Sequence, residues 1–349
     1  MKHRTALVGL GLALPPHAAS LKDLSDRVDL AYAVSGNPQR RDAFSREWPG
    51  VALVDDIAPV LADPSVRSVI LLTPPTTHLD LVRRCAQAGK HVLLEKPVEV
   101  TLERARDVIS CMESAGRTLG IVLQHRFRPA ALALADAIAD GDLGRLLSAN
   151  VQIRWWRDSA YFAQPGRGMK ARDGGGVLLT QAIHTLDLFL SLVGPVEEIF
   201  AYARTSGLRP AIDTEDMVSG VARLGNGAIA TIDANTVSYP GFPERIELAF
   251  EDGSAVLVGS KLRLEHKDGR HREAGEEAGT GAGTNVMAFP HDAHRALLRD
   301  FVDAVETGRA PRCSGKSALL VHEVIEAMLR SSETAAPIKL DESRELHSI

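Results

Sequence analysis

The 349-residue sequence contains little cysteine and no cysteine pattern typical of a zinc site or a disulfide framework. Its three cysteines, Cys85, Cys111 and Cys313, are widely spaced and odd in number. We expect reduced thiols, a cytoplasmic location and no metal site. The N-terminus agrees with this location, because residues 5–9 already have the pattern of a core strand rather than of a signal peptide.

The sequence also lacks a surplus of positive charge and a long uninterrupted apolar run. Its formal net charge is -5, without a block of like charges, which argues against nucleic acid as a partner. The longest apolar stretch, Val177–Val193, is interrupted by Gln181, His184 and Asp187, so we expect no membrane partner. With 45% hydrophobic and 24% charged residues, the composition is that of a globular protein with two domains.

Short apolar runs alternate with amphipathic helical stretches in the first third of the chain. Such alternation is typical of an α/β domain in which helices cover both faces of a parallel sheet. We place this domain at residues 1–123. The apolar runs that predict its strands are Thr5–Gly9, Leu30–Val34, Ser68–Thr73, His91–Glu95 and Thr118–Leu123.

Residues 124–349 show a different pattern, which predicts a second, α+β domain. Apolar runs are joined there by Asn226-Gly227, Asp252-Gly253 and Asp268-Gly269, dipeptides that favour the tight turns between antiparallel strands. A mainly antiparallel sheet is therefore expected. Two helices, about His291–Glu306 and Ser317–Ser331, close the chain, and the last helix and tail are free to pack back on the first domain.

A glycine turn follows the first predicted strand and precedes the first helix, where a dinucleotide fold binds its pyrophosphate. We assign Gly9, Gly11, Leu12 and Ala13 to this cofactor site. The motif is incomplete, because the position of a third glycine is occupied by Leu14. A turn without a ligand remains the alternative for this segment.

The end of the second predicted strand indicates which dinucleotide is bound. An acidic side chain there holds the ribose hydroxyls of NAD, whereas this chain has Ser35, Gly36 and Asn37, followed by Arg40. A hydroxyl, turn amides and a guanidinium suit the 2′-phosphate of NADP. We therefore expect NADP, with NAD less favoured. The alternative is a surface turn before a solvated helix.

Glu95-Lys96-Pro97 ends a strand of the first domain, and Gly174-Gly175-Gly176 opens a segment that reaches His184 in the second. Together with Thr73-Pro74, the glycine turn and the closing residues 337–340, these motifs resemble the glucose–fructose oxidoreductase and inositol dehydrogenase family, Gfo/Idh/MocA. The resemblance covers nearly the whole chain.

The resemblance implies a Rossmann domain, a doubly wound parallel sheet, and a C-terminal domain with a large open, mainly antiparallel sheet. It implies an NAD(P)-dependent dehydrogenase or reductase acting on CH–OH groups of sugars, polyols or sugar derivatives, and a homodimer or homotetramer. The residues that match the family's positions are Lys96 and His184 as the catalytic pair, Thr73, Pro74, His78, Glu95 and Lys96 at the cofactor, and Gln124 and Arg126 in the substrate cleft.

The chemistry of Lys96 and His184 supports this assignment. A histidine titrates near neutrality, so it can accept the hydroxyl proton in oxidation and return it in reduction. A nearby ammonium group stabilises negative oxygen. A buried structural histidine is the alternative for His184. The family often has an aspartate four residues before this histidine. This chain has Thr180 at that position, which we predict to contact the substrate. Asp187 is then a candidate for orienting the ring of His184.

Aromatic and basic residues before the glycine triplet form the remaining substrate candidates. Trp155, Arg157 and Tyr161 are expected to line the sugar side of the cleft, and the arginine indicates an anionic group on the substrate. A cofactor-binding or purely structural role for the arginines is the alternative. Two alternative hypotheses for the function of the whole protein are redox-neutral chemistry of the kind used by NAD-dependent glycosidases, and a non-catalytic NADP-binding sensor.

Overall fold

The computed structural model describes residues 2–208, 212–277, 279, 281–283 and 289–340. The chain forms two compact units, residues 1–124 with 291–319 and residues 125–290 with 320–349. The first unit is thus discontinuous in sequence. We expected 1–123 and 124–349, with the last helix and tail free to pack back. In the structure the returning segment is 291–319, whereas the rest of the last helix and the tail are grouped with the second unit.

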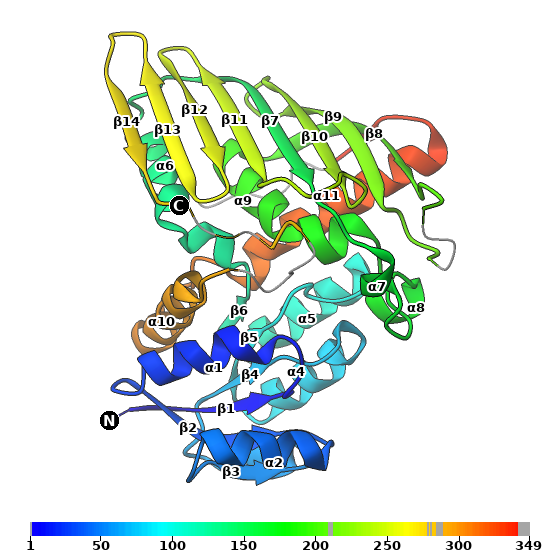
Figure 1. Ribbon diagram of the computed structural model, residues 1–349. Coiled ribbons are helices and arrows are strands. Elements are labelled where there is room, and N and C mark those ends of the chain that lie inside the picture. The colour runs from blue at the N-terminus through cyan, green and yellow to red at the C-terminus, as the bar shows by residue number, and fades with distance from the viewer. Residues whose placement is uncertain (1, 209–211, 278, 280, 284–288, 341–349) are drawn as a thin grey trace. The chain divides into compact units, whose positions relative to one another are not determined.

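A six-stranded sheet in the order β3-β2-β1-β4-β5-β6 forms the centre of the first unit, and all its strand pairs are parallel (Figure 1). The parallel sheet expected from the alternating apolar runs is confirmed. The sequence pattern missed β3, whose three residues are too few for a periodic signal. The strands are β1 (His3–Val8), β2 (Val28–Val34), β3 (Ala52–Val54), β4 (Ser68–Leu71), β5 (His91–Leu94) and β6 (Leu119–Ile121).

Helices connect the strands of this sheet, and a helix from the returning segment joins them. α1 packs against α10, and α4 packs against α5 (Figure 1). The helices are α1 (Leu14–Asp23), α2 (Pro38–Glu47), α3 (Ala58–Ala62), α4 (His78–Gln87), α5 (Leu102–Ser114) and α10 (Asp292–Thr307), with the 3-10 turn η1 (Pro75–Thr77) and the start of α11 (Gly315–Thr334).

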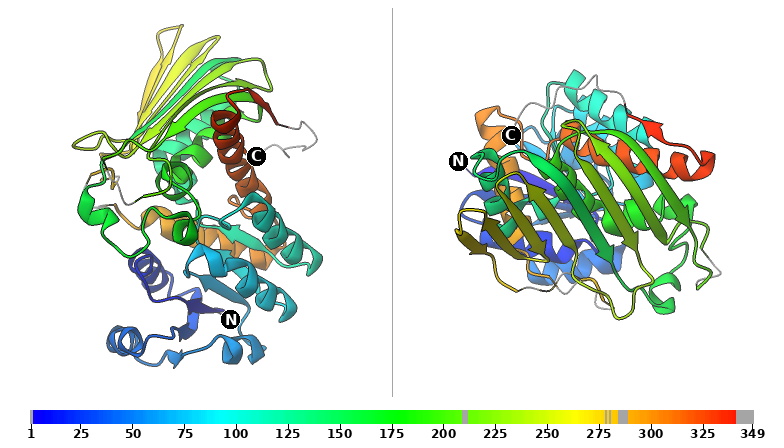
Figure 2. Two further views of the ribbon diagram at one scale, coloured as in Figure 1. Left: turned by 90° about the vertical axis from the view of Figure 1, so that its right-hand side faces the viewer. Right: turned by 90° about the horizontal axis from the view of Figure 1, so that it is seen from above.

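A nine-stranded sheet in the order β14-β13-β12-β11-β7-β10-β9-β8-β15 forms the second unit (Figure 2). Only β7 and β10 pair in parallel, so the expectation of a mainly antiparallel sheet is confirmed. The strands are β7 (Leu146–Arg154), β8 (Val196–Arg204), β9 (Met217–Leu224), β10 (Ile229–Asn235), β11 (Arg245–Phe250), β12 (Gly253–Val258), β13 (Lys261–His266), β14 (His271–Ala274) and β15 (Ile338–Lys339).

Helices pack on one face of this sheet and leave the other face open (Figure 2). Residues alternate along the strands between the buried and the open face, as in β9, where Val218 and Ala222 are buried and Val221 is 51% exposed. The helices are α6 (Pro129–Ala139), α7 (Ser159–Phe162), α8 (Lys170–Asp173), α9 (Ile183–Val193) and the remainder of α11, with the 3-10 turn η2 (Gln124–Phe127) and the π-helical turn η3 (Leu178–Ala182).

Residues 170–193 form the one described helical stretch that is long and apolar enough to cross a membrane by length and composition alone. Our expectation that no stretch reaches this length was therefore wrong. Its most apolar window is 83% buried, as is typical of a helix at the centre of a folded unit. We interpret this stretch as the core of the second unit, where α9 packs on β7.

Candidate functional site

The turn after β1 has the geometry that a pyrophosphate requires. Gly9 has φ +102°, and a Cβ added to it would lie 2.8 Å from the carbonyl carbon of Leu72, so only glycine fits. α1 then begins at Leu14, whose amide donates to the Gly11 carbonyl (3.2 Å). Because the next two residues are prolines, the amides that an anion can meet at this turn belong to Gly11, Leu12 and Ala13. Leu12 is 69% exposed.

The loop after β2 places a cation beside this glycine turn. One terminal nitrogen of Arg40 lies 3.7 Å from the Cβ position of Gly11. Arg40 is exposed, and Gly36 has open space around it. Asn37 has a structural task, since its side chain accepts a hydrogen bond from the Arg40 amide and caps α2. The Ser35 hydroxyl accepts a bond from the Asn37 amide (3.3 Å).

The Glu-Lys-Pro motif follows directly after β5. One carboxylate oxygen of Glu95 is hydrogen bonded to Nε2 of His17 (2.8 Å), and the other accepts the backbone amide of Lys96 (3.0 Å). Burial alone would raise the pKa of Glu95. The hydrogen bond from His17, together with the charges of His17, Lys96 and His294, outweighs burial and lowers it. Glu95 thus supports the backbone at Lys96 as an ionised carboxylate.

His17 and His294 are members of this site that the sequence analysis missed. They come from α1 and α10, and their rings meet edge to face with centroids 5.3 Å apart. With Glu95 they form the one group of described residues whose three possible metal-ligating atoms lie within 4.8 Å of one another. Because Glu95 already binds His17 and the Lys96 amide, we interpret the group as a hydrogen-bonded cluster. The position of His17 in the helix after the glycine turn was the only available signal.

The loop after β4 contains Thr73, Pro74 and His78. Thr73 and Pro74 lie just before η1, and the Thr73 hydroxyl accepts a bond from Thr77 (2.9 Å). His78 was expected to contact the cofactor, but its side chain is fully buried. Its ring nitrogens face the carbonyls of Thr73 (2.9 Å) and of Pro97 and Val98 (3.1 Å each). His78 therefore ties this loop to the Glu-Lys-Pro loop, and a direct contact with the cofactor is not supported.

The glycine triplet of the second unit is held by Glu215, which the sequence analysis also missed. The carboxylate of Glu215 accepts the amides of Gly176 (3.1 Å) and Leu178 (3.2 Å) at the start of the helix that carries His184. A Cβ on Gly176 would lie 1.9 Å from the Glu215 carbonyl oxygen, which explains this glycine. Burial raises the pKa of Glu215, although the amides of Leu178 and Gly176 oppose the shift.

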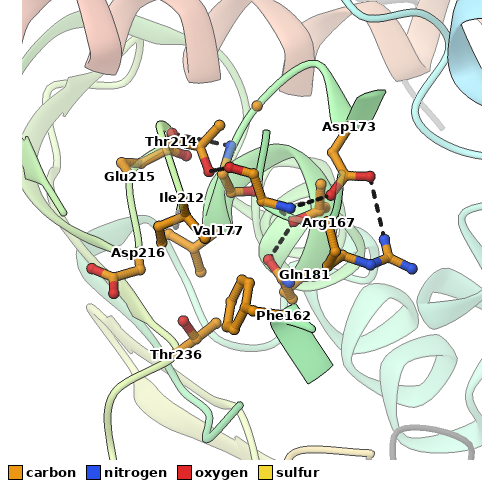
Figure 3. Close-up of a pocket in the computed structure, with 14 residues that line it drawn as sticks. Phe162, Arg167, Asp173, Val177, Gln181, Ile212, Thr214, Glu215, Asp216 and Thr236 are labelled. Atoms are coloured by element: carbon orange, nitrogen blue, oxygen red, sulfur yellow. Dashed lines mark hydrogen bonds and ion pairs between the residues drawn. The ribbon is translucent and has the colours of Figure 1, made fainter. Parts of the chain in front are cut away.

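A small cavity lies beside this contact, with Phe162, Val177 and Gln181 on its walls (Figure 3). Arg167 and Asp173 form an ion pair at its edge, with 3.4 Å between the charged atoms. The Thr180 hydroxyl lies 2.6 Å from the Gly176 carbonyl oxygen and also contacts the side-chain oxygen of Gln181. Thr180, predicted to contact substrate, therefore also stabilises the turn in which it lies.

His184 lies at the second position of α9. It is the one residue between Gln181 and Leu190, all of them described, that is not buried. Its ring packs on that of His125, with centroids 5.1 Å apart and planes inclined by 31°. This partial exposure within a buried helix argues against a purely structural histidine.

Asp187 and Arg126 form a buried ion pair, which corrects two expectations. The guanidinium of Arg126 donates to both carboxylate oxygens of Asp187, at 2.6 and 2.5 Å. The exposed fractions of the two side chains are 8% and 1%. Asp187 is thus committed to Arg126 and is not the group that orients His184. Arg126, which was predicted to lie in the substrate cleft, has its guanidinium engaged by this buried carboxylate.

The guanidinium of Arg157 is also committed within the protein. It donates to the carbonyls of Gly281 (2.8 Å), Gly283 (2.7 Å) and Trp156 (2.8 Å), and it lies 4.9 Å from the ring centroid of Trp155. Arg157, Trp155 and Gln124 are all buried. Tyr161 is partly exposed, and its hydroxyl accepts a bond from Gln181 (3.1 Å). The expectation that Arg157 binds an anionic substrate is therefore not supported.

Comparison with known proteins gives the same assignment for both parts of the chain. Residues 3–122 match the family model described as the oxidoreductase family, NAD-binding Rossmann fold. Residues 131–256 match the GFO/IDH/MocA C-terminal domain.

Individual relatives align over nearly their whole lengths. Myo-inositol 2-dehydrogenase of Thermotoga maritima is 28% identical, over 97% of this chain and 99% of that protein. The NAD(+)-dependent scyllo-inositol 2-dehydrogenase of Bacillus subtilis is 25% identical, over 99% and 98%. A crystal structure of the WlbA dehydrogenase from Bordetella pertussis, in complex with NADH and UDP-GlcNAcA, is similar with a TM-score of 0.82 and 27% identity, over 98% of this chain and 99% of that one.

Proposed function

This chain belongs to the Gfo/Idh/MocA oxidoreductase family, and from that membership we propose that Lys96 and His184 carry out its reaction. The protein transfers a hydride between a nicotinamide cofactor and a carbinol or carbonyl carbon of a sugar-like substrate. The observation that carries the assignment is the pairing of two family motifs with matching local geometry. Lys96 follows β5 on a backbone held by Glu95, and His184 is partly exposed in a helix whose other residues, apart from Ser191, are buried.

The residues at the glycine turn fit a dinucleotide, because Gly9 allows the tight turn against the backbone of Leu72 and the amides of the turn precede α1. A nicotinamide cofactor held there would supply the acceptor or donor of the hydride. In oxidation His184 takes the proton of the substrate hydroxyl, and in reduction it returns that proton to the oxygen. The ammonium of Lys96 stabilises the negative charge that develops on this oxygen. Neither role requires a carboxylate at the position of Thr180.

NADP is the cofactor that the loop after β2 favours. No acidic side chain stands at position 35, so the ribose hydroxyl pair of NAD has no carboxylate to bind there. Arg40 supplies a positive charge beside the glycine turn, where a 2′-phosphate can accept two hydrogen bonds from it. The named relatives with a stated cofactor use NAD(+) or NADH, so NADP preference is a property proposed for this chain.

Two substitutions test the cofactor assignment. Ser35→Asp places a carboxylate against the 2′-phosphate and should weaken NADPH binding by about tenfold or more. Arg40→Gln should weaken NADPH binding and leave NADH binding nearly unchanged, whereas Arg46→Gln, an exposed arginine of the same helix, serves as the control. Dissociation constants from cofactor fluorescence titrations give the answer. Improved use of NAD by Ser35→Asp without loss of NADP would overturn this account of the loop.

An uncharged sugar or polyol is the substrate class that the second unit favours. Two of the relatives described above are named for inositols, which are uncharged polyols, whereas the WlbA structure contains UDP-GlcNAcA, a charged sugar nucleotide. In this chain Arg126 and Arg157 are engaged by Asp187 and by backbone carbonyls, so neither guanidinium is left for a carboxylate or phosphate. Turnover of inositols and neutral sugars should exceed that of the matching uronic acids and sugar phosphates.

The experiment that tests the proposed reaction follows NADPH absorbance with a panel of polyols, sugars and sugar nucleotides. Lys96→Ala and His184→Ala should each lose turnover by at least about a hundredfold, and His184→Ala should bind cofactor normally. Product formation without net change in absorbance would indicate redox-neutral chemistry instead. Tight cofactor binding without hydride transfer to any substrate would favour a sensor.

The open face of the second sheet supports assembly into a homodimer or homotetramer. Tyr202, Val221 and Ile229 project from adjacent strands on that face and are 67%, 51% and 58% exposed. A cytoplasmic location is proposed as well, because the structure joins none of the three described cysteines in a disulfide.

A further inference from the structure

We propose that His125 is a positioning residue that holds the ring of His184 in place for proton exchange. Its own ring is kept neutral and fixed by Arg128, and it packs directly on His184. This inference rests on the proposed role of His184 in hydride transfer. It identifies the orienting group that neither Thr180 nor Asp187 supplies.

The contact between the two rings is close and enclosed. Their centroids are 5.1 Å apart with an inclination of 31°, and His125 is only 4% exposed. Because a tilted stacked ring covers one face of the imidazole, His184 cannot turn freely about its side-chain bonds. The other side groups considered for this task are engaged elsewhere, since Asp187 binds Arg126 and the Thr180 hydroxyl contacts the Gly176 carbonyl.

The contact with Arg128 determines the protonation of His125. Nη2 of Arg128 lies 2.6 Å from Nε2 of His125. A guanidinium can only donate hydrogen bonds, so Nε2 of His125 must accept and carries no proton. The ring proton is then on Nδ1, which lies 3.3 Å from the hydroxyl oxygen of Thr185. His125 is therefore a neutral imidazole with a defined tautomer.

Arg128 is itself held in place, which makes the arrangement rigid. Its guanidinium forms an ion pair with the carboxylate of Glu244 and donates to the Gly259 carbonyl (3.3 Å). Glu244 is 4% exposed and directly precedes β11, while Arg128 directly precedes α6. The chain of contacts from Glu244 through Arg128 and His125 to His184 thus rests on two well-packed elements.

A neutral His125 has a chemical consequence for its neighbour. When His184 takes up the substrate proton, the ring against it carries no charge, so this contact adds no like-charge repulsion. The nearby ions are paired, Arg128 with Glu244 and Arg126 with Asp187. If His125 were protonated in place of accepting from Arg128, two positive groups would face each other and His184 would gain a charged neighbour.

Two variants of His125 separate packing from charge. His125→Ala removes the ring and should lower kcat by about tenfold or more while leaving the cofactor dissociation constant within about twofold. His125→Phe preserves an uncharged ring face and should restore much of kcat. His271→Ala, an exposed histidine of the same unit, is the control. Equal, wild-type kcat in both His125 variants, or equal loss in both, would overturn the proposal.

A nitrogen-15 NMR measurement tests the same arrangement without substrate. In the wild-type protein, His125 should show the neutral Nδ1–H tautomer at neutral pH, and His125→Phe identifies its signals by their loss. A protonated ring or an Nε2–H tautomer would contradict the proposal. The His184 signals should broaden or shift in His125→Ala and stay closer to wild type in His125→Phe. A wild-type protein that shows these signals but turns over no substrate would count against the proposed function alone.

Discussion

The carboxylate of Glu95 and the imidazole of His17 are joined by a 2.8 Å hydrogen bond that links the helix after the glycine turn to the end of β5. The two side chains are 12% and 2% exposed, so water offers little replacement for either partner. The second oxygen of Glu95 holds the amide of Lys96. The backbone of Lys96, the lysine proposed to act in the reaction, is therefore supported from the helix that follows the glycine turn.

His17→Ala removes this support and leaves a buried carboxylate without its imidazole partner. We expect a loss of about 3 kcal/mol in the stability of the first unit, because breaking a buried pair from one side leaves an uncompensated charge. Hydrogen exchange of the β1 and β5 amides measures this loss of stability. His291→Ala removes an exposed contact with Asp23 and should cost much less, because water replaces the lost partner. Similar losses for both variants would contradict the importance of the buried bond.

Gly176→Ala tests the contact that holds the glycine triplet. The added methyl group would lie 1.9 Å from the Glu215 carbonyl oxygen, so the backbone must move, and the hydrogen bonds that the Gly176 and Leu178 amides donate to the Glu215 carboxylate must break. We expect about 2–4 kcal/mol of destabilisation, visible as faster hydrogen exchange over residues 176–182. Gly175→Ala meets only the side chain of Leu179 at 3.1 Å and is the matched control, with a smaller effect. A milder result for Gly176 than for Gly175 would refute this account.

His3 makes the first unit sensitive to acid. Burial, and then the charges of Arg67, His91 and Arg27, lower its pKa from 6.5 to about 4. The folded protein binds this proton less readily than the unfolded chain. His3 therefore does not lower the free energy of unfolding above pH 6.5, and it lowers that free energy progressively as the pH drops from 6.5 to about 4.

His3→Gln removes this titration. The loss of first-unit stability between pH 7 and pH 4.5 should be about 2 kcal/mol smaller in the variant than in the wild type. Urea unfolding, monitored by the hydrogen exchange of the β1 and β4 amides, gives the free energy of unfolding of the wild type and of the variant at each pH. His271→Gln controls for removing a histidine in general. An unchanged pH dependence would show that His3 titrates normally in the folded state.

Val221→Glu tests the open sheet face as the assembly surface. Val221 faces Phe200 across the β8–β9 pair and is 51% exposed, so a buried glutamate there should weaken self-association by at least about tenfold. Light scattering after gel filtration measures the mass, and circular dichroism confirms folding. Lys267→Glu, in an exposed turn of the same unit, is the control. An unchanged mass of a folded Val221→Glu protein would place the interface elsewhere.

Features set by neighbouring residues could be predicted from the sequence. The period of the apolar runs predicted the parallel sheet, and the turns at Gly227 and Gly269 have the positive φ that Asn-Gly and Asp-Gly favour. At Asp252-Gly253 the prediction was displaced, since Gly253 already belongs to β12. The motif residues Lys96 and His184 were assigned by their place after a strand and after the glycine triplet, which local pattern and family resemblance supply.

Features set by the partner of a side chain could not be predicted. Arg126 and Asp187 are 61 residues apart, and Glu95 and His17 are 78 apart, so no local spacing reveals either pair. A free arginine and an arginine engaged by a buried carboxylate look the same in a sequence. That is why Arg126 and Arg157 were assigned to substrate, and why Glu215 and His125 went unnoticed.

The discontinuity of the first unit has a consequence for synthesis of the protein. Its two segments are separated by residues 125–290, which form the body of the second unit. α10 packs on α1, and Ser314 bridges to Gly120 beside β6, so the nucleotide-binding half lacks part of its interior until these late residues leave the ribosome. The half that begins first is completed near the end of translation, and a fragment cut after residue 123 would lack the partner that covers α1.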